Sequence, residues 1–96
     1  MFKEIKIAVF HELKTDPIVF QESWDQKKMY EIRLNDRLFK LNEILILRET
    51  EYTGEEMASQ GLKLRFTGRQ LTRRIICITK GYGLQEGWCI LGLEVI

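Results

Sequence analysis

Glu43-Ile44-Leu45-Ile46-Leu47-Arg48-Glu49 is the stretch of the sequence that decides the fold. Its apolar residues fall on both faces of an extended chain, so both faces of this strand should be covered by protein. We therefore expect a central strand, or the wall of a barrel against which a helix packs. Two further apolar runs follow at residues 71–80 and 88–95, and Gly81-Tyr82-Gly83 between them permits a tight turn.

The N-terminal part predicts one more strand and one helix. Ile5-Lys6-Ile7-Ala8-Val9 alternates apolar and polar side chains, as a half-buried strand does. Asp16-Pro17 is typical of a helix start, because aspartate caps a helix well and proline suits its first turn. Phe20 and Trp24 lie four residues apart and would share one face of a helix that ends at about residue 25.

The remaining chain completes a β-rich pattern. Residues 29–33 read as a strand, Asn35-Asp36-Arg37 as a turn, and residues 52–69 as a polar connection that contains a hairpin. Short turns between consecutive strands favour an α+β, β-rich domain built as a small antiparallel β-barrel with one short N-terminal helix. We expect residues 1–96 to form a single domain. The predicted core includes Ile7, Trp24, Ile46, Ile76 and Leu91.

The net charge of +1 excludes the global positive field of a strongly cationic nucleic-acid binder. The charge is nevertheless uneven, because residues 57–85 contain six basic and no acidic side chains, whereas residues 43–56 are rich in glutamate. Two interpretations stay open. The two runs are solvated faces that pair with each other, which we favour, or the basic run is a ridge for phosphates.

The sequence offers little for metal or nucleophilic chemistry. Cys77 and Cys89 lie in apolar runs and read as small buried hydrophobic residues, and with His11 they supply too few metal ligands. No serine or cysteine has a nearby histidine partner for a catalytic triad. No apolar run approaches the roughly 20 residues of a membrane span, and the first residues lack the apolar core of a signal peptide. We expect a cytoplasmic protein that needs no cofactor.

The run from Lys28 to Arg33 resembles the signature of ASCH domains, which belong to the PUA-like superfamily. That signature is a glycine, a lysine two residues later, a glutamate three further on and an arginine two further on. Lys28, Glu31 and Arg33 match it, and Gln26 stands where the glycine is usual. Residues 54–63 look like an insertion. Further segments resemble a stand-alone bacterial and phage branch of the family. They are residues 11–14, 20, 24, 35–37, 39–40, 44–49, 66–69 and 81–84.

The resemblance implies a small β-barrel with a cleft beside the signature that binds RNA or a modified base. The residue chemistry agrees with that expectation. Glu31 and Arg33 project from the same face of a strand, where glutamate can accept from a base amine and arginine can donate to carbonyl or phosphate oxygens. Strict alternation would put Lys28 on the other face, so we expect it to precede the strand or to be re-aimed by a bulge.

We therefore predict a domain that binds RNA, or a nucleotide or nucleoside, through this cleft. A minor branch of the resembling family hydrolyses N4-acetylcytidine, and an enzyme of that type is the alternative. Position 31 is glutamate where those relatives use threonine, and Thr15 precedes the helix, so we expect binding without turnover. An ordinary surface ion-pair set, or a protein-interaction module without a ligand, would also account for these residues. Tyr82 either offers a face for base stacking or plugs the barrel end. The predicted cleft residues are Lys28, Glu31, Arg33 and Arg37, with Lys14, Lys80 and Tyr82 at the rim.

Overall fold

A computed structural model describes residues 8–96 of the chain. The strand expected at residues 5–9 and the predicted core residue Ile7 thus fall largely outside the described part, and the first strand begins at Phe10. The elements of the described part are β1 (Phe10–Thr15), α1 (Pro17–Trp24), β2 (Tyr30–Leu34), β3 (Ile44–Thr50), α2 (Gly54–Gln60), β4 (Phe66–Thr79) and β5 (Trp88–Val95).

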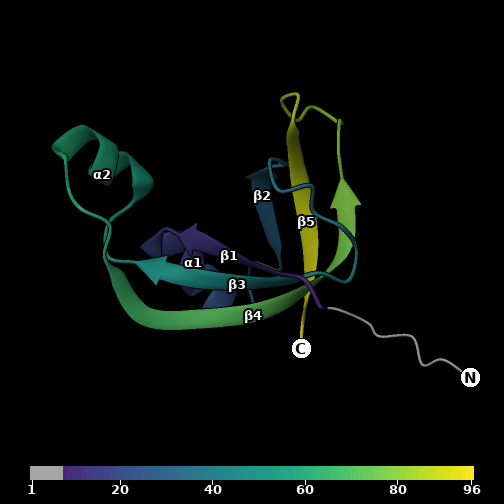
Figure 1. Cartoon of the computed structure of the whole chain (residues 1–96), viewed down its shortest axis with the longest axis horizontal. Helices are drawn as coiled ribbons and strands as arrows, with labels where there is room; N and C mark the ends of the chain where they lie inside the picture. Colours follow the sequence, from purple (N-terminus) through teal and green to yellow (C-terminus); the bar gives the residue numbers. More distant parts are fainter. Residues whose placement is uncertain (1–7) are drawn as a thin grey trace, which may run out of the picture.

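The strands form one five-stranded mixed sheet in the order β1-β3-β4-β5-β2, curled into a half-barrel (Figure 1). β1 runs parallel to β3, with Phe10 opposite Ile44 and Thr15 opposite Glu49, whereas the other pairs are antiparallel. The predicted α+β, β-rich class is confirmed, but the sheet is mixed and curled into a half-barrel rather than built as an antiparallel barrel. The chain leaves β1 through α1 and β2 before it returns as β3, and a crossover of that kind is what parallel neighbours need.

β4 joins the two halves of the curled sheet. Its 14 residues pair with β3 over positions 66–74 and with β5 over positions 73–79. The register shifts between Ile75 and Cys77, and such a bulge bends a strand and increases its twist. Figure 1 shows β4 turning from the β1–β3 half towards the β5–β2 half.

The core lies between α1 and the inner face of the sheet. β3 is an interior strand rather than an edge strand, as predicted, because β1 and β4 flank it on either side. Phe20 of α1 is fully buried together with Leu45 and Leu47 of β3, which lie two residues apart and share one face. The core cluster consists of Leu13, Phe20, Phe39, Leu45, Leu47, Ile75, Cys89, Leu91 and Leu93.

Leu91 is fully buried, as predicted, whereas three other predicted core residues are less buried than expected. Ile46 is only partly buried, because its neighbours on β3 take the core face. Ile76 is half-exposed because it follows the fully buried Ile75, and successive side chains of a strand point to opposite faces. Trp24 is 44% exposed and lies beside Phe20, with the ring centroids 6.0 Å apart. Cys77 is exposed as well, so only Cys89 is a buried thiol.

α1 begins at Pro17, as predicted, but Asp16 does not cap it with its side chain. The Asp16 carboxylate accepts a hydrogen bond from the backbone N–H of Gly54 instead, at 3.0 Å. Gly54 is the first residue of α2, so Asp16 ties the start of one helix to the start of the other.

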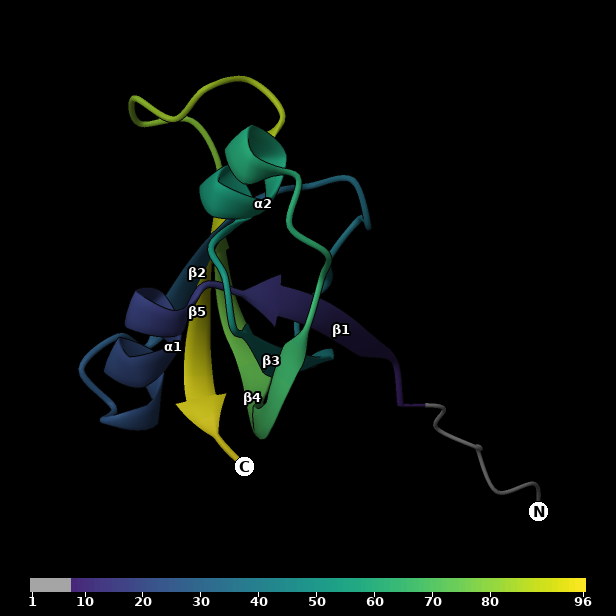
Figure 2. The same ribbon diagram turned by 90° about the vertical axis from the view of Figure 1, so that its left-hand side faces the viewer.

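α2 is a second helix where the sequence predicted only a polar connection with a hairpin. Thr53 and Glu56 form a capping box, and Gly61 ends the helix with φ of 64°. The helix stands away from the sheet at the far end of β3 and β4 (Figures 1 and 2). No helix within residues 8–96 has the length and apolar content that crossing a bilayer requires.

Candidate functional site

β2 places Glu31 and Arg33 on the inner face of the half-barrel. Across the antiparallel pair, Glu31 lies opposite Leu91 and Arg33 opposite Cys89, and both partners are fully buried. Cross-strand partners share a face, so the two charged side chains point inward. Glu31 is only 3% exposed, which is exceptional for a carboxylate unless it is paired.

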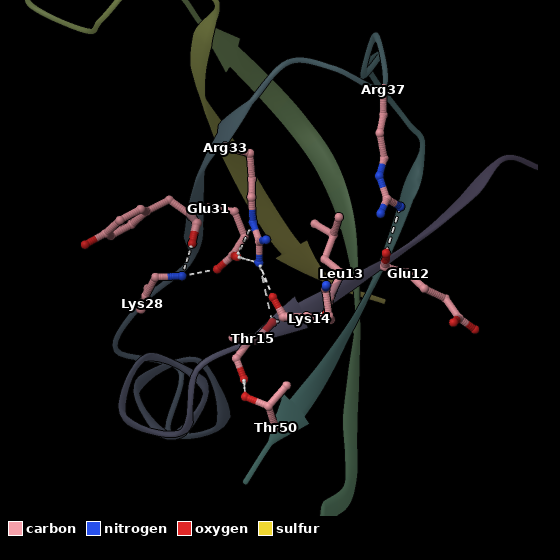
Figure 3. Close-up of polar contacts among 10 residues, drawn as sticks. Glu12, Leu13, Lys14, Thr15, Lys28, Glu31, Arg33, Arg37 and Thr50 are labelled. Carbon is pink, nitrogen blue, oxygen red and sulfur yellow. Dashed lines mark hydrogen bonds and ion pairs between the residues drawn. The ribbon is translucent and has the colours of Figure 1, made fainter. Parts of the chain in front are cut away.

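The Glu31 carboxylate is held between two cations (Figure 3). Its Oε1 accepts hydrogen bonds from Arg33 Nη2 at 2.7 Å and from Arg33 Nε at 3.1 Å. Its Oε2 contacts the Lys28 ammonium group. The buried charge is thus compensated on both oxygens, and removal of either partner would leave it short of a counter-charge.

Lys28 precedes β2, as expected from the strand period. The turn after α1 positions it, since the Lys28 backbone N–H donates to the Glu22 carbonyl oxygen at 3.1 Å. Its Nζ donates to the Tyr30 carbonyl oxygen at 2.7 Å and lies 5.1 Å from the centre of the Tyr30 ring. Gln26 in this turn has φ of 58°, the left-handed conformation that glycine adopts most easily.

Arginine side chains bridge the two edges of the sheet. β1 and β2 are the edge strands, and Arg33 Nη2 donates to the Lys14 carbonyl oxygen at 3.1 Å. Arg37 Nη1 donates to the Glu12 carbonyl oxygen at 2.7 Å, at a separate point along β1 (Figure 3). The gap in the half-barrel is therefore spanned by guanidinium groups rather than by a backbone ladder.

A cavity of about 370 Å³ opens beside Glu31. It brings together four of the predicted residues, Lys14, Lys28, Glu31 and Arg33. The sequence interpretation missed the rest of the lining, which comes from the end of β1, from α1 and from the alternate positions of β2. The additional lining residues are Thr15, Asp16, Val19, Glu22, Tyr30 and Ile32.

Thr15 is the most consequential of the missed residues. It is 2% exposed, and its Oγ1 lies 3.5 Å from Arg33 Nη2. No threonine lies within the signature itself, as expected, but the open edge of β1 faces β2 and brings Thr15 to the same cavity. The Thr15 hydroxyl donates to the Leu13 carbonyl oxygen at 3.3 Å, and the Thr15 carbonyl oxygen lies 3.2 Å from Thr50 Oγ1.

Three predicted residues lie outside this cavity. Arg37 lines a neighbouring cavity of about 230 Å³, and Lys80 lines one of about 480 Å³ at the loop before β5. Tyr82 is 96% exposed at the tip of that loop, so it does not plug the barrel end. His11 has a structural role, since its Nε2 lies 2.8 Å from Glu43 Oε1 and its ring packs edge-on against Phe39.

Much of the charge elsewhere is paired. Arg69 hydrogen-bonds Glu49 and lowers the pKa of that carboxyl, the Thr67 hydroxyl lowers it further, and burial opposes both. Glu51 and Arg65 form a looser ion pair, with 3.9 Å between Glu51 Oε2 and Arg65 Nε. These contacts join the acidic and basic runs, as the favoured interpretation predicted. In the part of the chain that the structure describes, no group of three or more His, Cys, Asp or Glu side chains could hold a metal ion.

Comparison with known proteins places the chain in a family. A family model described as a domain of unknown function, DUF3850, matches residues 10–93, which include every residue of the cavity beside Glu31. No curated protein matches the sequence. Because the match extends over nearly the whole chain, this protein belongs to the DUF3850 family.

Proposed function

We propose that this protein binds RNA or a nucleotide in the cavity beside Glu31, and that it is a PUA-like domain of the ASCH type. The observation that carries the proposal is the buried Glu31 carboxylate, held between Lys28 and Arg33 in the wall of an open cavity. A buried ion pair contributes little net stability compared with apolar packing, and its place in the wall of a cavity favours a role in recognition.

The chemistry of the lining supports a nucleotide as the ligand. The volume of about 370 Å³ falls at the lower end of the range for small-ligand pockets. Glutamate accepts hydrogen bonds from the exocyclic amine of cytosine, and arginine donates to carbonyl or phosphate oxygens. Lys14 is exposed at the same cavity and supplies a positive charge for a phosphate, while Val19 and Tyr30 offer apolar surface for a base or ribose.

The assignment to the ASCH type rests on the signature together with its surroundings. The curled half-barrel is consistent with a PUA-like fold, and Lys28, Glu31 and Arg33 converge on one point. Gln26 departs from the signature in residue type but keeps the positive φ that a glycine would adopt there. The turn that precedes β2 therefore retains the backbone conformation that glycine favours.

Hydrolysis of a modified nucleoside is the second candidate, because the Thr15 hydroxyl lines the same cavity. Binding is favoured over hydrolysis by the hydrogen bonds already made. Both Glu31 oxygens accept from cations, Lys28 Nζ also donates to a backbone carbonyl, and the Thr15 proton is donated to Leu13. None of these groups is arranged to take a proton from a hydroxyl or a water molecule.

A direct binding experiment tests the proposal. Fluorescence anisotropy would follow a labelled single-stranded oligoribonucleotide, and calorimetry would follow cytidine 5′-monophosphate. Lys14→Ala should weaken binding of both, because it removes an exposed charge at the cavity without disturbing the core. Lys63→Ala is the matched control, since Lys63 is also exposed but lies between α2 and β4. Equal effects of the two variants, or no binding at all, would contradict the proposal.

A further inference from the structure

The cavity beside Glu31 is the first of three that adjoin one another along β2. Arg33 lines both this cavity and the one that contains Arg37, so its side chain forms a shared wall. Trp88 lines both the Arg37 cavity and the cavity beneath the loop that contains Lys80. We call this chain of cavities the β2 groove; it extends from Lys14 through Arg37 to Lys80.

Each cavity of the β2 groove contributes one cation that forms no ion pair within residues 8–96, although carboxylates line the cavities as well: Asp16, Glu22 and Glu31 the first, Asp36 the second and Glu86 the third. Lys14 lines the first, Arg37 the second and Lys80 the third. None of the ion pairs within residues 8–96 includes any of these three side chains. Arg33, in contrast, is committed to Glu31. Cations spaced along a groove are the electrostatic feature that follows a phosphate backbone.

Aromatic side chains accompany the cations at the far end. Trp88 forms a wall between two cavities and is 37% exposed. Tyr82 is 96% exposed and has φ of 52°, between Gly81 at 78° and Gly83 at 87°. A tyrosine in the left-handed conformation is strained, and the Tyr82 ring is almost wholly exposed, so the strain motivates a functional role for this side chain. Figure 2 shows this loop projecting beyond the sheet.

We propose that the β2 groove binds a single-stranded RNA segment of about four nucleotides, the lower end of the range for small nucleic-acid-binding barrels. Backbone phosphates lie against Lys14, Arg37 and Lys80, and bases stack on Trp88 and Tyr82. This inference rests on the proposed function and specifies its ligand.

The length and chemistry of the groove select this ligand. From Tyr30 to Leu34, β2 alone spans roughly 14 Å, at about 3.4 Å per residue, and the groove continues past Trp88. A groove of that length is longer than one nucleotide of an extended strand. Bases must be unpaired to stack on aromatic side chains, so a duplex cannot use the same contacts.

The test compares three probes by calorimetry: cytidine 5′-monophosphate, a single-stranded RNA tetranucleotide, and a blunt RNA duplex. Tyr82→Asn removes the ring but keeps a residue that tolerates the left-handed conformation, and Trp88→Leu keeps apolar volume in the wall. We expect the tetranucleotide to bind more tightly than the other two probes. Each variant should weaken the tetranucleotide by about 5- to 150-fold, which corresponds to the loss of one stacked base, and should leave the mononucleotide unchanged.

The outcomes separate this inference from the proposed function. If mononucleotide and tetranucleotide bind equally, and Tyr82→Asn changes neither, the extended groove is wrong while binding at the Glu31 cavity stands. Tight binding of the duplex would also overturn the single-strand assignment. If none of the three probes binds, both proposals fail. Thermal unfolding of Tyr82→Asn should match the wild type, because the replaced ring is almost wholly exposed.

Discussion

Arg33 Nη2 lies 3.1 Å from the carbonyl oxygen of Lys14, so a side chain of β2 holds the opposite edge of the sheet. The same guanidinium group binds Glu31 through Oε1. One arginine therefore links the open edge of the half-barrel to the buried carboxylate of the candidate site. A ligand that displaces or strengthens either contact would act on the curvature of the sheet as well as on the cavity.

Truncation of two apolar side chains should differ in its effect on stability, because one residue is fully buried and the other is half-exposed. Leu47→Ala should lower the free energy of unfolding by about 2–5 kcal/mol, because Leu47 is fully buried and its truncation leaves a cavity. Ile76→Ala should cost less than about 1 kcal/mol, because half of the Ile76 side chain is already exposed. Urea unfolding of both variants measures the difference. Similar losses would show that the assignment of faces along β4 is wrong.

The turn before β2 makes a second prediction. Gln26 has φ of 58°, which a residue with a side chain adopts at a cost that glycine avoids. Gln26→Gly relieves this strain but also gives the unfolded chain more conformational freedom, and the two effects oppose each other. The net result should be a rise of about 0.5–1 kcal/mol in the free energy of unfolding. Thermal unfolding provides the measurement. A loss of stability would mean that the Gln26 side chain contributes more than its backbone strain costs.

Acid should weaken the fold through Glu49. Hydrogen bonds from Arg69 lower the folded-state pKa of this carboxyl below about 4.5, against the opposing effect of burial. A depressed folded pKa contributes stability that is present above the unfolded pKa and is lost as the pH falls through the folded value. Unfolding measured between pH 7 and pH 3 should therefore show a steeper loss for the wild type than for Glu49→Gln.

The matched control for this effect is Glu12→Gln, which removes a carboxylate whose side chain is 64% exposed. Between pH 7 and pH 3, this variant should lose about as much stability as the wild type. If Glu49→Gln also keeps the full dependence on acid, the contact with Arg69 does not contribute in solution.

Several elements could be predicted because local chemistry determines them. Asp16-Pro17 predicted the start of α1, and the continuous apolar run of β3 predicted a central strand. Strand periodicity predicted that Glu31 and Arg33 share a face and that Lys28 lies before the strand. These inferences depend only on neighbours along the chain.

Other features depend on contacts between distant segments and could not be predicted. The parallel pairing of β1 with β3 carries Thr15 to the cavity beside the predicted rim residue Lys14, although Thr15 lies far from the signature in the sequence. The bulge in β4 shifts the alternation after Ile75, so that Ile78 rather than Cys77 packs against the core. α2 is different, because the spacing of Thr53 and Glu56 is a capping-box signal that the sequence did contain.

The hydrogen bonds of the cavity predict that N4-acetylcytidine is not hydrolysed. Position 31 is glutamate rather than threonine, and the Thr15 hydroxyl donates to the Leu13 carbonyl oxygen. Incubation of the purified protein with N4-acetylcytidine should release no cytidine above the rate without protein, as followed by chromatography. Turnover that disappears in Thr15→Val or in Glu31→Gln would contradict the account and would favour the hydrolase alternative.

The central claim is that a charged cleft centred on Arg33 binds nucleic acid, and the affinity for single-stranded RNA as a function of salt tests it most directly. Two to four phosphate contacts predict a slope of roughly −1.5 to −3 in a plot of log K against log salt concentration. Arg33→Ala should weaken binding more than Arg65→Ala, because Arg65 lies between α2 and β4, away from the cavity. Equal effects of the two variants, or binding that does not depend on salt, would contradict the claim.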